Sequence, residues 1–393
     1  EILRCLVGSE MCIRDRLYDE NAVNEQQISG NSWFLRGLCA AYEINGRKDI
    51  LERLNLIAES YLCKLSASYL RYPMVKREEG DVDGHLQETV SDGWLLSSDV
   101  GCAFILLDGI THTYQITGKI SLEPVIRTMI EKFAAIDYVF YNCQTHATLS
   151  GTRGVLRFYK LTGEKKYLDL AIRNFDVYLQ CGITLNYANF NWFGKPYWTE
   201  PCAIVDSIMV AEQLFALTGE RKYAEFINRC YLNAFLPSLR PNGGAGCDTC
   251  LYEGNDCLEN HLYEAFFCCS MRIAEGFYEL IEYGVVKREN GFYVLLPLDI
   301  DCEELHMRVE EHERGRKITI TAHEKISRLS IYVPIRSKVR CVRGVMKGGT
   351  LEFENFSGTE QIEIEFARYT ERRQSKIVHM QGCLLYTSDA ADD

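Results

Sequence analysis

The chain has 393 residues, of which 47% are hydrophobic and 25% charged, and its formal net charge is −12 at pH 7. An acidic chain without a basic cluster offers no surface for a phosphate backbone, so we expect no nucleic-acid partner. We also find no apolar stretch near the roughly 18 residues that span a bilayer, and expect no membrane partner. The length exceeds one ordinary hydrophobic core, which predicts two domains.

The two ends of the sequence match translated sequencing-library adaptors. Residues 6–16 back-translate without a gap onto the end of a transposon adaptor, and residues 383–393 onto the reverse complement of its partner. We therefore predict adaptor-derived artefacts at residues 1–16 and 383–393, which are set aside as tags would be. Neither end has a hydrophobic period, so removing both is expected to leave the melting temperature unchanged. Residues 17–382 are predicted to be a fragment of a longer environmental protein.

A helical pattern with a recurrent turn runs from Trp33 to Tyr283. Thr-Gly-Glu-Lys-Lys-Tyr at 162–167 and Thr-Gly-Glu-Arg-Lys-Tyr at 218–223 each follow one apolar helix and precede another. A glycine in this place commonly ends a helix. The uneven spacing of such turns favours helical hairpins over a short-period solenoid. Because hairpins of this kind commonly close into a ring, we predict an α/α toroid at residues 17–284.

After Gly284 the chain alternates apolar and polar residues over strand lengths, as is typical of strands with one buried face. The alternating segments are residues 291–297, 317–322, 328–333, 350–354 and 361–366. Short strands separated by turns predict a β-sandwich, here at residues 285–382. The predicted fold class is therefore mainly α with a C-terminal β domain.

Cysteine is abundant, with 17 in the whole chain. Most of those in residues 17–382 lie singly within apolar helical patterns, where a free thiol behaves as a small buried hydrophobe. This use of cysteine predicts a reducing compartment, and hence the cytoplasm. A secretion signal is left open, because the natural N-terminus is missing.

One cysteine constellation has the composition of a metal site. Glu200-Pro-Cys202 and Cys268-Cys269 together offer a carboxylate and three thiols, which are legitimate ligands of tetrahedral Zn²⁺. Neither half is specific by itself in a chain with so many cysteines. The alternative interpretation is three core cysteines and a surface glutamate.

A rival cluster is Cys247-Asp-Thr-Cys250 with Cys257 further on. Zinc ribbons need a second Cys-x-x-Cys pair, which the sequence lacks. The flanking glycines at 243, 244, 246 and 254 indicate a loop between helices. We therefore interpret this cluster as a loop with incidental thiols.

The first constellation lies at two predicted helix starts, in Tyr197-Trp-Thr-Glu-Pro-Cys-Ala-Ile-Val205 and Ala265-Phe-Phe-Cys-Cys-Ser-Met-Arg-Ile273. Here the chain resembles the β-L-arabinofuranosidases of glycoside hydrolase family 127, formerly a domain of unknown function. The signature of that family is Glu-x-Cys at one helix start and Cys-Cys at a later one. The resemblance extends to the Thr-Gly turns and to the strand at 328–334.

This resemblance implies a zinc ion bound by Glu200, Cys202, Cys268 and Cys269, in a catalytic domain at residues 17–284. It also implies that Cys268 is the nucleophile of a retaining glycoside hydrolase acting on a small carbohydrate or glycan. The chemistry is sound, because a metal-bound thiol ionises at neutral pH and a thiolate can displace a glycosidic leaving group. Sulfur then takes the place of the usual second carboxylate.

Further candidates concern sugar binding. By the resemblance, His146 at a predicted helix start binds substrate, although a histidine bonded to backbone is an equal alternative. The aromatic loop at 186–198 contains Tyr187, Trp192 and Trp198, which suit either a sugar ring or a buried lid. His261 lies between the cysteine loop and the Cys-Cys pair, where it is expected to line the pocket.

The chain departs from the family at the proton donor. Family members carry a glutamic acid shortly before the Glu-x-Cys, whereas residues 181–199 contain no Asp or Glu. The replacement donors that we consider are Glu253, Asp256 and Glu259. Two other functions stay open: a non-catalytic or degenerate carbohydrate-binding member, and a metal-free lyase or epimerase on the same toroid. The sequence leaves the oligomeric state open.

Overall fold

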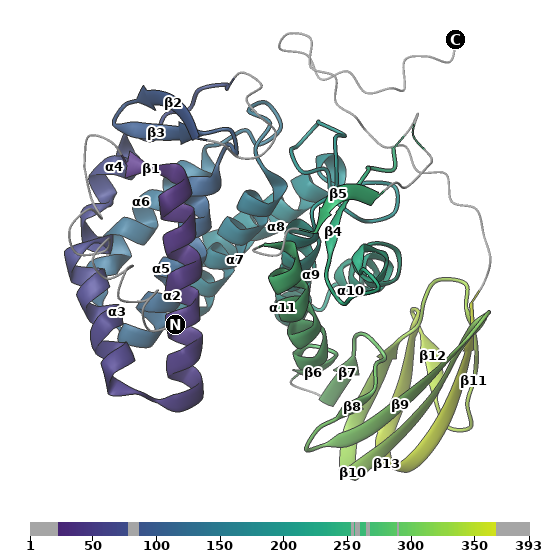
Figure 1. Ribbon diagram of the computed structural model, residues 1–393. Helices are drawn as coiled ribbons and strands as arrows, with labels where there is room; N and C mark the ends of the chain where they lie inside the picture. Colours follow the sequence, from purple (N-terminus) through teal and green to yellow (C-terminus); the bar gives the residue numbers. More distant parts are fainter. Residues whose placement is uncertain are drawn as a thin grey trace. The chain divides into compact units, whose positions relative to one another are not determined.

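The computed structural model describes residues 23–77, 86–252, 255, 260–264, 268–288 and 291–366 (Figure 1). The predicted artefacts at both ends, and the candidate donors Glu253, Asp256 and Glu259, lie outside these ranges. Two compact units divide the chain. The first contains the described residues up to Ile183 together with Phe190–Tyr197, and the second contains Thr184–Asn189 and the described residues from Trp198 onward.

The first unit is built from helical hairpins and one small sheet. Its helices are α2 (Glu25–Asn45), α3 (Lys48–Ser60), α4 (Ser66–Leu70), α5 (Leu106–Thr117), α6 (Glu123–Ala134), α7 (Thr145–Thr162) and α8 (Lys165–Cys181). The sheet has the order β1 (Val23–Asn24), β3 (Trp94–Ser97), β2 (Leu86–Ser91).

The predicted glycine turns are confirmed. Gly163, in the turn predicted at 162–167, follows α7 with φ of 70°, in the left-handed region that a side chain disfavours, and Gly118 after α5 has the same conformation, with φ of 63°. The backbone N–H of each donates to a carbonyl in the last turn of its helix. Each turn therefore ends one helix and allows the chain to reverse into the next.

A buried carboxylate joins three helices of the first unit. Asp108 of α5 is 1% exposed and forms ion pairs with Arg36 of α2 and with Arg153 and Arg157 of α7. Burial opposes its charge, but the three guanidinium groups hold the pKa of this carboxyl well below its usual range. Close beside it, α7 passes α5 at Gly154, where an added Cβ would lie 2.3 Å from the carbonyl carbon of Leu107.

The second unit continues with α9 (Pro201–Thr218), α10 (Arg221–Cys230), a π-helical turn (Tyr231–Phe235), a 3-10 turn (Leu236–Ser238), the pair β4 (Gly246–Asp248) and β5 (Asn260–Glu264), and α11 (Cys269–Glu282). Helix α9 packs against α10 and α11. By length and composition alone α9 is apolar enough to cross a membrane, so the expectation that no stretch reaches this length is wrong. However, 78% of it is buried inside the protein, which explains its hydropathy as that of a core helix.

The β-region of the second unit is a single sheet, within the described residues, of eight strands. They are β6 (Val285–Arg288), β7 (Gly291–Val294), β8 (Ile300–Asp301), β9 (Leu305–His312), β10 (Gly315–Tyr332), β11 (Lys338–Arg340), β12 (Val345–Lys347) and β13 (Thr350–Glu365). The two strands predicted at 317–322 and 328–333 are halves of β10, which shifts register against β13 between Ala322 and Ile326.

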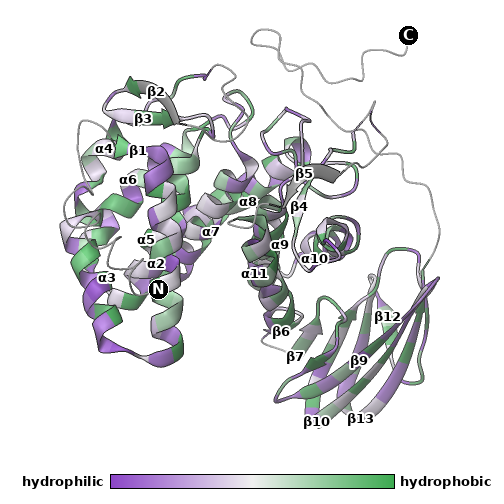
Figure 2. Ribbon diagram, viewed as in Figure 1, coloured by the Kyte–Doolittle hydropathy of each residue, from purple (hydrophilic) through white to green (hydrophobic). Residues whose placement is uncertain are grey.

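One half of β10 pairs with β9 and the other with β7, so the long strand joins two groups of shorter strands. Buried residues of both halves, such as Ile318 and Ile331, belong to one hydrophobic core. The alternation of hydrophobic and hydrophilic residues is visible along β10 and β13 (Figure 2). The predicted fold class, mainly helical with a C-terminal β-region, is confirmed.

We predict that Gly154→Ala destabilises the protein by about 3 kcal/mol, because its methyl group would overlap backbone atoms of α5 that cannot move aside as a side chain can. Urea unfolding monitored by circular dichroism measures this. Gly37→Ala is the matched control, since Gly37 lies in α2 with nothing within 4 Å of an added Cβ. That change should instead raise stability by about 0.5–1 kcal/mol through helix propensity. Equal effects of the two substitutions would contradict the packing argument.

Candidate functional site

The start of α9 is fixed by hydrogen bonds of Glu200 and Thr199. Glu200 is the N-cap residue, and its carbonyl accepts from the N–H groups of Ala203 and Ile204. Its own N–H donates to Asn189 Oδ1 at 3.0 Å. The preceding Thr199 exchanges hydrogen bonds with the backbone of Asp248 in β4. Pro201 at the first helical position suits a helix start, because it lacks the N–H that would have no partner there.

The start of α11 presents the two adjacent cysteines. Cys268 is the N-cap residue and Cys269 the first residue of the helix. The Cys268 carbonyl accepts from the N–H of Arg272 at 3.0 Å, which is the first turn of the helix. Cys269 is 1% exposed, whereas Cys268 is only half-buried. The two neighbouring thiols therefore have different access to solvent.

These two helix starts bring the four predicted metal ligands together. One ligand atom from each of Glu200, Cys202, Cys268 and Cys269 lies within 4.8 Å of all the others. The Sγ atoms of Cys202 and Cys268 are 2.8 Å apart, and Cys268 Sγ lies 3.7 Å from Glu200 Oε1. A tetrahedral zinc site with bonds of about 2.0–2.3 Å spaces its donors about 3.5–3.8 Å apart. The donor types fit such a metal ion, and the 3.7 Å sulfur–oxygen separation matches this spacing. The two sulfur atoms at 2.8 Å would have to lie about 1 Å further apart around a bound ion.

The electrostatics of the cluster also favour a cation. Burial raises the pKa of the Cys202 thiol well above its usual value, and the neighbouring Cys268 and Cys269 thiols and the Glu200 carboxylate act in the same direction. A site that gathers ionisable thiols around a carboxylate, away from water, repels further negative charge. A bound divalent cation would reverse this effect and deprotonate the thiols.

A buried ion pair one helical turn further on connects the same two helices. Asp206 of α9 lies four residues after Cys202, and Arg272 of α11 lies four residues after Cys268. Their side chains, 0% and 5% exposed, form an ion pair, and Arg272 also pairs with Glu275 of its own helix. This contact holds the register of α9 against α11, and with it the spacing of the two ligand pairs.

The predicted sugar-binding residues divide between the units. In the second unit, Tyr187 is buried, and its hydroxyl accepts from Arg229 Nη1 at 2.5 Å, which gives it a packing role against α10. Trp198 is half-buried, two residues before Glu200. In the first unit, the ring of His146 stacks on Trp33 at 5.6 Å between centroids.

Trp192 belongs to the first unit, where it forms a backbone bridge with Gln144 just before α7. His146 lies in the first turn of the same helix, so these two predicted residues come from neighbouring segments. His261 falls in β5, and its side chain lies outside the described part of the structure. Substrate binding by all five residues stays a prediction.

The rival cysteine cluster is not assembled by the residues that are described. Cys250 is buried with its thiol toward the carbonyl of Asn189 at 3.7 Å, and burial raises its pKa. Neither Cys247 nor Cys250 belongs to a group of three or more potential metal ligands in the described residues, and Cys257 lies outside them. The loop instead supports the start of α9 through Asp248, whose carboxylate pairs with Arg240 at 2.9 Å.

Sequence reasoning missed three residues that shape this site. Asn189 holds the N–H of Glu200, and Asp206 and Arg272 join the two helices. For Asp206 and Arg272 the available signal was a charged residue four positions after a cysteine in each helix, and Asn189 carried no such signal. Charges in such places are almost never buried unless they are paired.

Comparisons with known proteins identify the family that this segment matches. Residues 191–282 match the family model described as "Beta-L-arabinofuranosidase, GH127 catalytic domain", and this segment contains all four ligands. The resemblance to that family is thereby confirmed for the segment with the Glu-x-Cys and Cys-Cys signature. No curated protein matches the chain significantly.

Two solved structures show the same fold. A GH127 β-arabinofuranosidase is 14% identical, with a TM-score of 0.61 over 87% of this chain and 59% of that one. A GH127 β-L-arabinofuranosidase from Geobacillus stearothermophilus T6 is 12% identical, with a TM-score of 0.57 over 93% of this chain and 64% of that one. The chain thus spans less than two thirds of the length of either protein.

We predict that Asp206→Asn lowers the free energy of unfolding by about 3 kcal/mol or more, because it leaves Arg272 buried without its partner on α9. Glu275→Gln is the control, since Glu275 pairs with the same arginine but lies on the same helix and is 24% exposed. That change should cost about 0.5 kcal/mol at most. Chemical unfolding of both variants measures the difference, and a loss that is the same in both would refute the role of the inter-helix pair.

Proposed function

We propose that the protein is a zinc-dependent glycoside hydrolase that cleaves β-L-arabinofuranosides with retention of configuration, with Cys268 as its nucleophile. The observation that carries this proposal is the convergence of Glu200, Cys202, Cys268 and Cys269 at the starts of α9 and α11. The family model that matches this segment describes a β-L-arabinofuranosidase catalytic domain, which supports the choice of sugar.

Three thiols and one carboxylate would hold the ion, and the ion would supply the positive charge that keeps Cys268 ionised at neutral pH. Cys268 suits the nucleophile because it is the least buried of the four and lies at a helix N-terminus, where the helix dipole favours a thiolate. Cys202 and Cys269 are buried and serve as ligands only.

The reaction has two steps. The Cys268 thiolate attacks the anomeric carbon, the carbon–sulfur bond forms as the glycosidic bond breaks, and the leaving oxygen takes up a proton. Water then attacks the same carbon and gives up one proton to the group or solvent that supplied the first. The carbon–sulfur bond breaks, which releases the sugar and restores the thiolate. Two displacements at one carbon retain the configuration.

The proton donor is the open part of this mechanism. Residues 182–199 contain no carboxylic acid, and the nearby Asp248 is already paired with Arg240. A donor from Glu253, Asp256 or Glu259 stays a proposal. Leaving groups that need little protonation are therefore the best substrates for a first assay.

A non-catalytic carbohydrate-binding protein is the second candidate, because the donor expected from the family is missing. A metal-free lyase or epimerase is disfavoured, since it would leave the gathered thiols without a role. We also propose a reducing compartment such as the cytoplasm, which is supported by the thirteen cysteines of the described residues, all of them free.

We expect one zinc ion per chain, measured by mass spectrometry under native conditions. Cys202→Ala or Cys269→Ala should abolish binding, because each removes one of four ligands. Cys250→Ala is the matched control, a buried thiol outside the cluster, and should keep full occupancy. A metal-free wild-type protein, or full occupancy in Cys202→Ala, would overturn the metal assignment.

Cys268 should be the first thiol labelled by a haloacetamide or epoxide built on β-L-arabinofuranose. Peptide mapping identifies the labelled residue, and removal of zinc should slow labelling.

The protein should turn over nitrophenyl β-L-arabinofuranoside faster than natural disaccharides by about 10²-fold or more, because a phenolate leaves without an acid. Labelling at Cys247 or Cys250 would show a different nucleophile, and neither labelling nor turnover in zinc-loaded protein would favour the non-catalytic alternative.

A further inference from the structure

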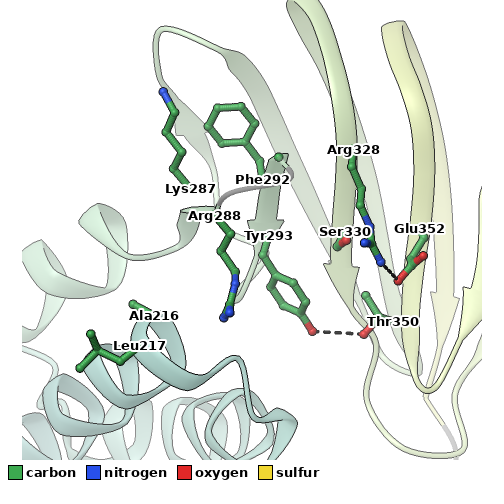
Figure 3. A pocket seen from close by; sticks show the side chains of 11 residues that line it. Ala216, Leu217, Lys287, Arg288, Phe292, Tyr293, Arg328, Ser330, Thr350 and Glu352 are labelled. Carbon is green, nitrogen blue, oxygen red and sulfur yellow. Dashed lines mark hydrogen bonds and ion pairs between the residues drawn. The ribbon is translucent and has the colours of Figure 1, made fainter. Parts of the chain in front are cut away.

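A cavity lies in the second unit, between the last turn of α9 and the β-region (Figure 3). Its volume is about 560 Å³, within the range typical of small-molecule sites. Residues of α9, β6, β7, β10 and β13 line it, and Glu200, Cys202, Cys268 and Cys269 are not among the described lining residues. It is therefore separate from the candidate metal site.

A row of polar side chains crosses three strands on one wall of this cavity. Ser330 of β10 lies in register with Tyr293 of β7 on one side and with Glu352 of β13 on the other. The alternate residues of β10, Leu329 and Ile331, belong to the hydrophobic core, so the row faces away from it. The row combines hydroxyl groups with a carboxylate, and such a surface can donate to and accept from a polyhydroxylated ligand.

The positions of the polar groups are fixed by contacts around the row. The Tyr293 hydroxyl lies 3.2 Å from Thr350 Oγ1, and Arg328 donates to Glu352 Oε1 at 2.6 Å, as the dashed lines in Figure 3 show. The Tyr293 ring packs on Phe215 of α9, with centroids 4.7 Å apart. Groups held in this way lose little conformational entropy when a ligand binds.

The charge of the cavity is predominantly positive. Lys287, Arg288 and Arg328 line it, against the single carboxylate of Glu352 among the described lining residues. Arg288 Nη1 donates to the Phe215 carbonyl at 2.9 Å, which holds its guanidinium group at the end of α9. Lys287 is in register with Phe292 and therefore lies on the face of β6 opposite the polar row, 77% exposed and 3.9 Å from Glu304. The cations beside the row are therefore Arg288 and Arg328 (Figure 3). These cations leave a net attraction for an anionic ligand.

We propose that this cavity binds a saccharide unit that carries a carboxylate, that is, a uronic acid within a glycan chain. The ring hydroxyls meet the polar row of Tyr293, Ser330 and Glu352, and the carboxylate meets the cations beside it. A neutral sugar leaves the cations unmatched, and an inorganic anion leaves the row unmatched. The site would hold an acidic glycan on the protein independently of its cleavage.

Isothermal titration of the full chain with an α-1,4-linked galacturonic acid tetramer tests this proposal. The fully methyl-esterified tetramer is the matched ligand, because it keeps the sugar skeleton and loses the charge. The acidic tetramer should bind at least tenfold more tightly, in line with the strength of charge-assisted hydrogen bonds. Equal binding of the two, or binding of neither, would overturn the proposal.

Two variants localise the binding. Arg328→Gln, at a side chain that is 45% exposed, should weaken the acidic tetramer about fivefold. Ser330→Leu should abolish binding by filling the cavity, with an unchanged melting curve showing that it folds. Lys338→Gln is the control, since Lys338 is an exposed lysine of β11 outside this cavity. Equal weakening by Lys338→Gln, or competition by millimolar sulfate as strong as by galacturonate, would show non-specific attraction and reject the proposal.

The test is independent of the proposed function. Cys202→Ala, which is expected to lose zinc, should bind the acidic tetramer as the wild-type protein does, because Cys202 does not line the cavity. If the hydrolase proposal fails, this binding should persist. If binding requires zinc, the cavity is not the site that was measured.

Discussion

The candidate metal site depends on the packing of α9 against α11. Each helix contributes two ligands from its first turn, and neither pair can form a tetrahedral site by itself. The relative register of the two helices therefore decides whether four donors meet. That register is held one turn further along by the buried pair of Asp206, four residues after Cys202, and Arg272, four residues after Cys268. Structural support and candidate chemistry thus share the same interface.

Much of this site could be predicted from the sequence, because its signals are local. A Glu-x-Cys and a Cys-Cys at helix starts are each contained within three residues, and the proline beside Glu200 marks the helix start. The glycine turns could also be predicted from the sequence, because few residues other than glycine adopt the left-handed conformation at the end of a helix.

Contacts between residues far apart in the sequence could not be predicted in the same way. The partner of Asp206 lies 66 residues away in α11, and no periodicity connects the two positions. The β-region shows the same limit: residues 317–322 and 328–333 have separate strand patterns, yet β10 runs through both because β13 stays paired across the register shift. Helix α9 is apolar on all sides because it is enclosed by other elements, which its sequence alone does not reveal.

In the core of the first unit, Asp108 and the three arginines paired with it should differ in how well they tolerate substitution. Asp108 is shared by Arg36, Arg153 and Arg157, so each arginine has two companions around the same charge. Loss of one arginine leaves the carboxylate paired twice, whereas loss of Asp108 leaves three like charges together around a buried position. Natural variation in this protein should therefore be freer among the three arginines than at the single acid that they share.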